Sequence, residues 1–172
     1  MAPGQLDVEE FREFSRRGRA AMGRDETAAL GLLERSLASW RDVPLHDVPL
    51  SLPLRAAVDA LQEERQVTFE SWADAGLALG RHRELLPALQ REVARFPLRE
   101  RPWGQLMLAL FRSSRRADAL RMFQRLRLGL VGELGLEPCQ ELRRLHERII
   151  ADDPALHAAA PTAPRVLPAT PG

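Results

Sequence analysis

Two segments, LGRHRELLPALQ (79–90) and SSRRADALRMFQ (113–124), are related by a shift of 34 residues. The shift places Gly80 on Ser114 in a polar turn, and Leu89 on Phe123 in the segment that follows the turn. Apolar positions before the turn align as well: Phe69 with Trp103, Trp72 with Leu106, and Gly76 with Leu110. Because apolar residues recur at helical spacing in both segments, the sequence predicts two copies of one helix–turn–helix unit.

A period of 34 residues is that of tetratricopeptide-like repeats, in which pairs of antiparallel helices stack on one another. In this pattern a small residue, Ala119, lets two helices approach closely, and large residues fill the space between pairs. A third, more degenerate unit is expected over residues 8–40, where GRDETAALGLL resembles the same turn. The repeat predicts a core that contains Phe69, Trp72, Leu86, Leu89, Trp103, Leu106, Leu110, Ala119 and Phe123.

The remaining chain also shows helical periodicity, so we expect an all-α fold of about seven antiparallel helices. Asp7 and Glu10 form a capping-box pattern that predicts the start of the first helix, and Asp25 is a candidate cap for the second. A long helix is expected from about Leu52 to Leu79, and the proline-containing segment before it predicts an ordered loop. The expected organisation is an N-terminal extension (1–6), a helical domain (7–151), and a flexible Pro/Ala-rich linker or tail (152–172).

Composition excludes several classes of protein. The chain has no apolar run of membrane-spanning length and no secretory signal pattern, so we expect a soluble, cytoplasmic protein. All 25 basic residues are arginine and the chain lacks lysine, asparagine and tyrosine, which indicates a GC-rich bacterial genome. The net charge of +1 gives no overall attraction to nucleic acid.

Residues for catalysis, cofactor binding or metal binding are not expected. The four histidines do not lie at metal-ligand spacing, and no glycine-rich phosphate loop or nucleophile elbow occurs. The single cysteine, Cys139, follows a proline at the expected start of the last helix. The dipole of that helix would favour a thiolate, but the preferred interpretation is a small residue at a capping position with no redox role.

An arginine cluster is the candidate contact for a partner. We expect Arg81, Arg83, Arg112, Arg115 and Arg116 to lie at neighbouring helix ends, with Arg99 and Arg101 nearby. Such a patch suits either DNA phosphates or an acidic protein surface. The alternative is a solvated surface of arginines paired with local carboxylates.

Three longer stretches resemble the bacterial transcriptional activator domain of the Streptomyces antibiotic regulatory protein family. They are FPLRERPW (96–103), SRRADALRMFQRLR (114–127) and ELGLEPCQELRRLHERI (133–149), and they occur in the family's order. The resemblance implies a tetratricopeptide-like domain that follows a winged-helix DNA reader, associates with itself, and contacts RNA polymerase and sigma subunits. Residues 1–6 are too few for a winged helix, so the DNA reader is expected outside this chain. The ending APTAPRVLPATPG (160–172) is similar to a linker that leads into an ATPase module.

The leading hypothesis is therefore a non-enzymatic protein–protein interaction and dimerisation module of a transcriptional activator of antibiotic or secondary-metabolite genes. Its expected partners are RNA polymerase and sigma subunits, a second copy, and the neighbouring DNA-binding and ATPase domains of its parent, with no membrane contact. Two alternatives remain: a direct, non-specific nucleic-acid-binding domain, and a generic tetratricopeptide-like adaptor. Sequence-specific DNA contact by this chain alone is not expected, because no element is available to read base edges in a groove.

Overall fold

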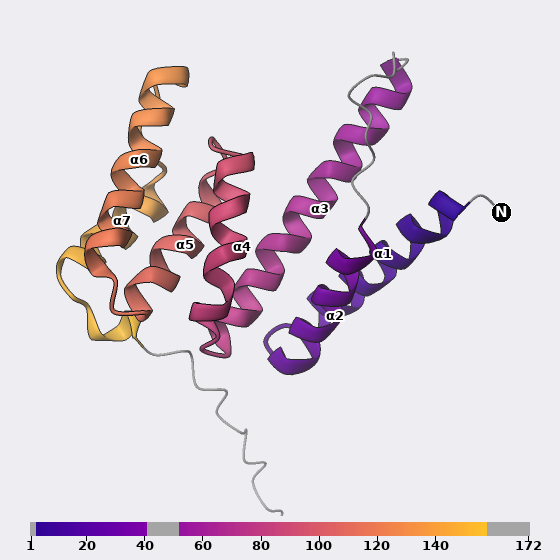
Figure 1. Ribbon diagram of the computed structural model, residues 1–172, viewed down its shortest axis with the longest axis horizontal. Helices are drawn as coiled ribbons and strands as arrows, with labels where there is room; N and C mark the ends of the chain where they lie inside the picture. The colour runs from indigo at the N-terminus through magenta and orange to yellow at the C-terminus, as the bar shows by residue number, and fades with distance from the viewer. Residues whose placement is uncertain (1–2, 41–51, 158–172) are drawn as a thin grey trace, which may run out of the picture.

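The computed structural model describes residues 3–40 and 52–157, which contain α-helices, one short 3-10 helix and no strand. The predicted all-α fold of about seven helices is confirmed. Successive helices run antiparallel in a row, from α1 and α2 at one end to α6 and α7 at the other (Figure 1). The elements are α1 (Pro3–Ala21), α2 (Glu26–Ser39), α3 (Leu52–Ala78), α4 (His82–Arg95), α5 (Glu100–Arg112), α6 (Arg116–Leu134), α7 (Gln140–Ile150) and η1 (Pro154–Leu156).

The two repeat units share one turn structure. Gly80 and Ser114, which the 34-residue shift pairs, both have left-handed backbones, with φ of 73° and 60°. In each turn the next amide donates back to a carbonyl five residues earlier: Arg81 N–H to Gly76 and Arg115 N–H to Leu110, both at 2.9 Å. This bond pattern ends a helix and satisfies a carbonyl that would otherwise have no intrahelical partner. The turn between α1 and α2 also contains a left-handed residue, Gly23, with φ of 77°.

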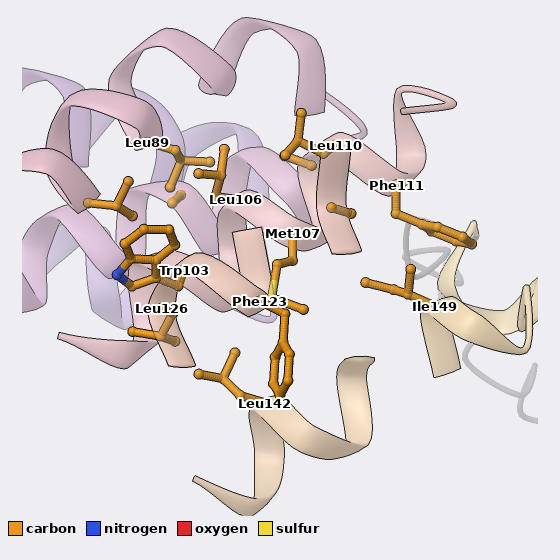
Figure 2. Close-up of a cluster of buried hydrophobic side chains, with 14 of the residues drawn as sticks. Leu89, Trp103, Leu106, Met107, Leu110, Phe111, Phe123, Leu126, Leu142 and Ile149 are labelled. Atoms are coloured by element: carbon orange, nitrogen blue, oxygen red, sulfur yellow. The ribbon is translucent and has the colours of Figure 1, made fainter. Parts of the chain in front are cut away.

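Most predicted repeat-core residues are buried between α3 and α7. Leu89, Leu106 and Ala119 are fully inaccessible, and Phe69, Trp103, Leu110 and Phe123 are at most 6% exposed. Trp72 and Leu86 are partly buried and pack against this cluster. Figure 2 shows the cluster, in which labelled side chains from α4, α5, α6 and α7 pack together. The indole Nε1–H of Trp103 donates to the Pro97 carbonyl at 3.0 Å, which satisfies its buried donor.

A second, smaller cluster joins α1 and α2 to the C-terminal part of α3. Ala29, Leu30 and Leu33 of α2 and Ala75 of α3 form it, and Trp72 packs against both clusters. The close approach of α1 to α2 requires Gly18, because a Cβ there would lie 2.7 Å from Leu33 Cγ. Between α1 and α3, the buried hydroxyls of Ser15 and Thr68 hydrogen-bond with their oxygens 2.7 Å apart. This small core positions α1 and α2 against α3.

Both ends of the helical region differ from the expected boundaries. α1 begins at Pro3 and not at Asp7, because a proline is compatible with the first turn of a helix. At the other end the packed structure continues past Ala151, into the segment from Asp152 onward that we expected to be a flexible tail. Asp153 caps η1 by accepting the Ala155 N–H at 2.9 Å, and Leu156 is 5% exposed in the main core. Residues 158–172 and the expected loop at 41–51 lie outside the described residues.

α2 and α3 agree closely with prediction. The Asp25 carboxylate accepts the Ala28 N–H at 2.9 Å, as expected of a helix cap. α3 ends at Ala78, and Gly80 then provides the left-handed turn. None of the described helices is long and apolar enough to cross a membrane.

Replacing Phe123 by alanine tests the repeat register. Phe123 is buried, and its ring stacks on His146 with centroids 3.9 Å apart. We expect Phe123→Ala to lower the free energy of unfolding by about 3–5 kcal/mol, through lost burial and the cavity left behind. Leu128→Ala is the matched control on the same helix, because Leu128 is 72% exposed; we expect a change within about 0.5 kcal/mol. Urea unfolding measures both. Equal effects of the two substitutions would contradict the register.

Ser114 provides a second test, because serine is strained at a left-handed φ that glycine adopts freely. We expect Ser114→Gly to raise the free energy of unfolding by about 0.5–1 kcal/mol and Gly80→Ala to lower it by about 1 kcal/mol. Gly31 in α2 has a helical backbone and open space around its Cα, so Gly31→Ala should instead stabilise by about 1 kcal/mol. Thermal unfolding checks all three, and destabilisation by Ser114→Gly would refute the shared turn.

Candidate functional site

The five candidate arginines lie along one edge of the domain, at the α3–α4 and α5–α6 turns. His82, the first residue of α4, lies at the first of these turns and shows that the two turns are close to each other. Burial lowers the pKa of the His82 imidazole, and the positive charges of Arg112 and Arg83 lower it further. Arg112 therefore reaches the first turn from the end of α5. We call Arg81, Arg83, Arg115 and Arg116 the arginine edge.

Arg112 has a structural role, unlike the other candidate arginines. Its Nε–H donates to the Leu156 carbonyl and its Nη1–H to the Leu77 carbonyl, both at 2.7 Å. The guanidinium thus joins the end of α3 to η1, and burial lowers its pKa. Charged hydrogen bonds to backbone carbonyls are among the stronger hydrogen bonds in proteins. Arg112 is therefore a clamp within the domain, which sets it apart from the four exposed arginines, and a partner contact at this position stays a prediction.

The arginine edge is solvent-exposed and held by local interactions. Arg115 Nε–H donates to Asp118 at 2.7 Å, and Arg121 shares the same carboxylate. These hydrogen bonds lower the pKa of Asp118. Arg116 donates to the Ile150 carbonyl at the end of α7. Arg81 forms an ion pair with Glu84, with Nε and Oε2 3.6 Å apart. Exposed pairs of this kind contribute little stability, so a partner's carboxylates can replace them at small cost.

Arg99 and Arg101 lie apart from this edge, at the start of α5, and bind carboxylates of α3. Arg99 Nε–H donates to Glu70 at 2.5 Å, and its Nη atoms donate to Glu63 at 2.7 and 2.9 Å. Burial opposes the Arg99 charge, but the two carboxylates outweigh it and raise its pKa above the ordinary arginine value. Arg101 Nη2–H donates to Asp74 at 2.6 Å. Both arginines connect successive repeats.

Sequence reasoning missed a groove between α3, α5 and α7, the first helices of successive pairs. Its volume is about 370 Å³. Asp74, Leu108 and Leu142 line it at positions separated by the same 34-residue shift, and this signal was available in the sequence. The groove is also lined by Leu77, Glu100, Arg101, Gly104, Gln105, Cys139, Glu141 and Leu145. We call it the α3–α5–α7 groove.

Cys139 is the capping residue immediately before α7, at the predicted start of the last helix, and its environment favours the neutral thiol. Burial raises the thiol pKa; backbone N–H groups of α7 oppose this, and the nearby Glu100 adds to the increase. The Cys139 N–H donates to Glu100 Oε2 at 2.6 Å, so this residue ties α7 to α5 through its backbone. Within residues 3–40 and 52–157, no three histidine, cysteine or acidic side chains are placed to hold a metal ion.

Comparison with known proteins places these surfaces in a family context. Residues 6–150 match the family described as the bacterial transcriptional activator domain. The regulatory protein DnrI of Streptomyces peucetius is 37% identical over 94% of this chain and 60% of its own length. The transcriptional regulator RedD of Streptomyces coelicolor is 36% identical over 90% of this chain and 44% of its own length. The chain thus spans about half the length of these relatives.

A solved structure agrees with the fold. Mycobacterium tuberculosis EmbR, in complex with a low-affinity phosphopeptide, superposes with a TM-score of 0.81 at 30% identity. The match covers 89% of this chain and 41% of the EmbR chain. The described helices therefore correspond to one part of the EmbR chain.

The two roles assigned to arginines predict different effects of substitution. We expect Arg112→Met to lower the free energy of unfolding by about 2–4 kcal/mol, because two charged hydrogen bonds to carbonyls are lost while the apolar stem is kept. Arg83→Met, at an exposed position of the arginine edge, should change it by less than about 0.5 kcal/mol. Urea unfolding at constant salt compares the two. A small loss for Arg112→Met would show that the clamp does not hold η1 in solution.

Proposed function

Because this chain belongs to the bacterial transcriptional activator domain family, found in regulators of the Streptomyces antibiotic regulatory protein type, we propose that it is the protein–protein interaction and dimerisation module of a transcriptional activator. In this proposal it works in the cytoplasm and supports recruitment of RNA polymerase. The observation that carries the proposal is the arginine edge, whose exposed guanidinium groups are held by exchangeable local pairs. Acidic surfaces of RNA polymerase, including its sigma subunit, are the proposed partners of this edge.

The remaining parts of the proposal concern the parent protein. Relatives that are longer than the matched region support a parent with a separate DNA reader, and a neighbouring ATPase module is proposed from the sequence of the C-terminal segment. Control of antibiotic or secondary-metabolite genes is proposed from the family resemblance. Self-association is proposed as well, in line with the exposed apolar residues near the end of α6, Leu128, Val131 and Leu134.

Non-specific nucleic-acid binding is the second candidate, and the arginine edge is also the observation that favours it. Arginines at helix ends can contact phosphates, but phosphate contacts carry no sequence information. Such binding weakens steeply with salt because it depends on counterion release. DNA affinity of this kind would be the same for promoter and unrelated sequences.

Charge reversal on the arginine edge tests the interaction proposal. The chain is fused to a DNA-binding protein of known specificity, and reporter transcription and capture of RNA polymerase are measured. We expect Arg115→Glu with Arg116→Glu to weaken polymerase capture about tenfold or more, which is the effect of losing roughly 1.4 kcal/mol of interaction. The matched control is Arg16→Glu with Arg17→Glu, two exposed arginines of α1, which should leave capture unchanged.

Footprinting at physiological salt tests the nucleic-acid alternative with the unfused chain. We expect no protected site on any promoter, and DNA affinity that falls steeply as salt rises. A discrete protected site would assign direct sequence reading to this domain.

In the capture experiment, polymerase capture that is weakened equally by the Arg115/Arg116 and the Arg16/Arg17 double substitutions would show that the arginine edge is not the contact surface.

A further inference from the structure

We propose that the α3–α5–α7 groove is the docking site for an extended partner segment in which leucine-sized apolar side chains flank a basic residue. The proposal names the partner chemistry of a second surface and rests on the interaction function proposed above. Three independent features of the groove carry it: an apolar floor, an acidic rim, and a buried acceptor that has no donor among the described residues.

The floor of the groove is made of leucines from three helices. Leu77 of α3, Leu108 of α5, and Leu142 and Leu145 of α7 line it. Leu77 and Leu142 are at most 5% exposed, while Leu108 and Leu145 are partly buried at the edge of the main core. Its volume of about 370 Å³ lies within the range of specific ligand pockets, roughly 300–1,000 Å³. The floor therefore accommodates apolar side chains from a partner.

The rim of the groove is acidic, in contrast to the arginine edge. Three carboxylates, Asp74, Glu100 and Glu141, line it with one arginine, Arg101, which is paired with Asp74. The Glu141 carboxylate has no side-chain hydrogen bond or salt bridge with the described residues, although its charge interacts with that of Arg101. Glu100 accepts the backbone N–H of Cys139. A basic side chain that follows an apolar anchor can therefore pair with Glu141 and Glu100. This charge balance selects a basic partner and rejects the acidic surfaces that suit the arginine edge.

Gln105 supplies an acceptor that the domain itself does not use. Its side chain is 5% exposed and lines the groove. The amide Nε2 donates to the Glu70 carbonyl and to Asp74 Oδ1, both at 2.7 Å, and these two acceptors set the orientation of the amide. Its Oε1 is buried and has no hydrogen-bond partner among the described residues. A buried acceptor without a donor is costly, and Gln105 lines the groove, so a backbone N–H of an extended segment that reaches Oε1 would recover this cost.

Three fluorescein-labelled hexapeptides test the proposed chemistry on the intact 172-residue chain. The probe Gly-Leu-Arg-Leu-Gly-Ser carries both features, Gly-Leu-Glu-Leu-Gly-Ser reverses the charge, and Gly-Ser-Arg-Ser-Gly-Ser removes the apolar groups. We expect saturable binding of the first probe in fluorescence anisotropy, with affinity about tenfold or more above either control. On binding, the methyl resonances of Leu108 and Leu145 should shift, while those of Leu30 and Leu33 in the smaller core should not.

Substitutions on α7 locate the charge contact. We expect Glu141→Arg to weaken binding of the arginine probe about tenfold. Glu147→Arg makes the same charge change on the same helix but outside the groove lining, and should leave the affinity unchanged. Equal unfolding temperatures of the two variants exclude misfolding as the cause. A milder variant, Glu141→Gln, should give a smaller loss in the same direction.

Several outcomes would overturn the groove proposal. These are equal affinity for the arginine and glutamate probes, no saturable binding of the arginine probe at about 1 mM, or methyl shifts confined to residues outside the groove. The polymerase experiment is independent of these results. Loss of polymerase capture in the arginine-edge variant with failed peptide binding would leave the proposed function standing and refute the groove. Peptide binding by a chain that captures no polymerase would support the groove and refute the proposed polymerase contact.

Discussion

The attachment of α5 to α3 through Arg99 is the interaction on which the stacking of the repeats depends. One guanidinium reaches two carboxylates and the amide of Gln66, all on α3, from the residue that precedes α5. Glu70 is 8% exposed, so loss of Arg99 would leave a buried carboxylate with weaker compensation, which is strongly destabilising. Arg65 and Glu92 make a similar two-bond pair between α3 and α4. These directional polar bonds therefore fix the positions of α4 and α5 relative to α3, because apolar packing of leucines is not directional.

α5 is held at both ends by different chemistry. Its start is tied to α3 by Arg99 and Arg101, and its end by the Arg112 clamp, which also holds η1. The α3–α5–α7 groove lies along α5 between these attachments, so two of its walls are well fixed. The third wall, α7, is tied to α5 by the bond from Cys139 N–H to Glu100. A groove with fixed walls loses little conformational entropy when a partner binds.

The sequence predicted the fold well because helical spacing and the 34-residue repeat can both be read directly from the order of residues along the chain. The shift of 34 residues identified the turns at Gly80 and Ser114, which have the same backbone and bonds. Sequence position alone placed Arg112 among the candidate contact arginines. Its clamp role depends on the Leu156 carbonyl, which reaches it only because the chain returns after α7. Leu156 was assigned to a tail because its neighbours are prolines and alanines, although its own side chain fills the core. The groove combines residues from three helices, and local patterns do not report such a combination.

The division of the interior into two cores has a consequence for how the domain opens. α1 and α2 share their own small core, and Trp72 packs against both this core and the larger one. Contiguous units with separate cores open as cooperative sub-domains with their own free energies, which amide hydrogen exchange resolves. We therefore expect the α1–α2 hairpin to exchange its protected amides at a lower opening free energy than α5. Trp72, one of the three tryptophans of the chain, would lose its contacts with the small core on this detachment while the repeats remain folded. Its share of the fluorescence therefore makes it an internal optical reporter of partial unfolding.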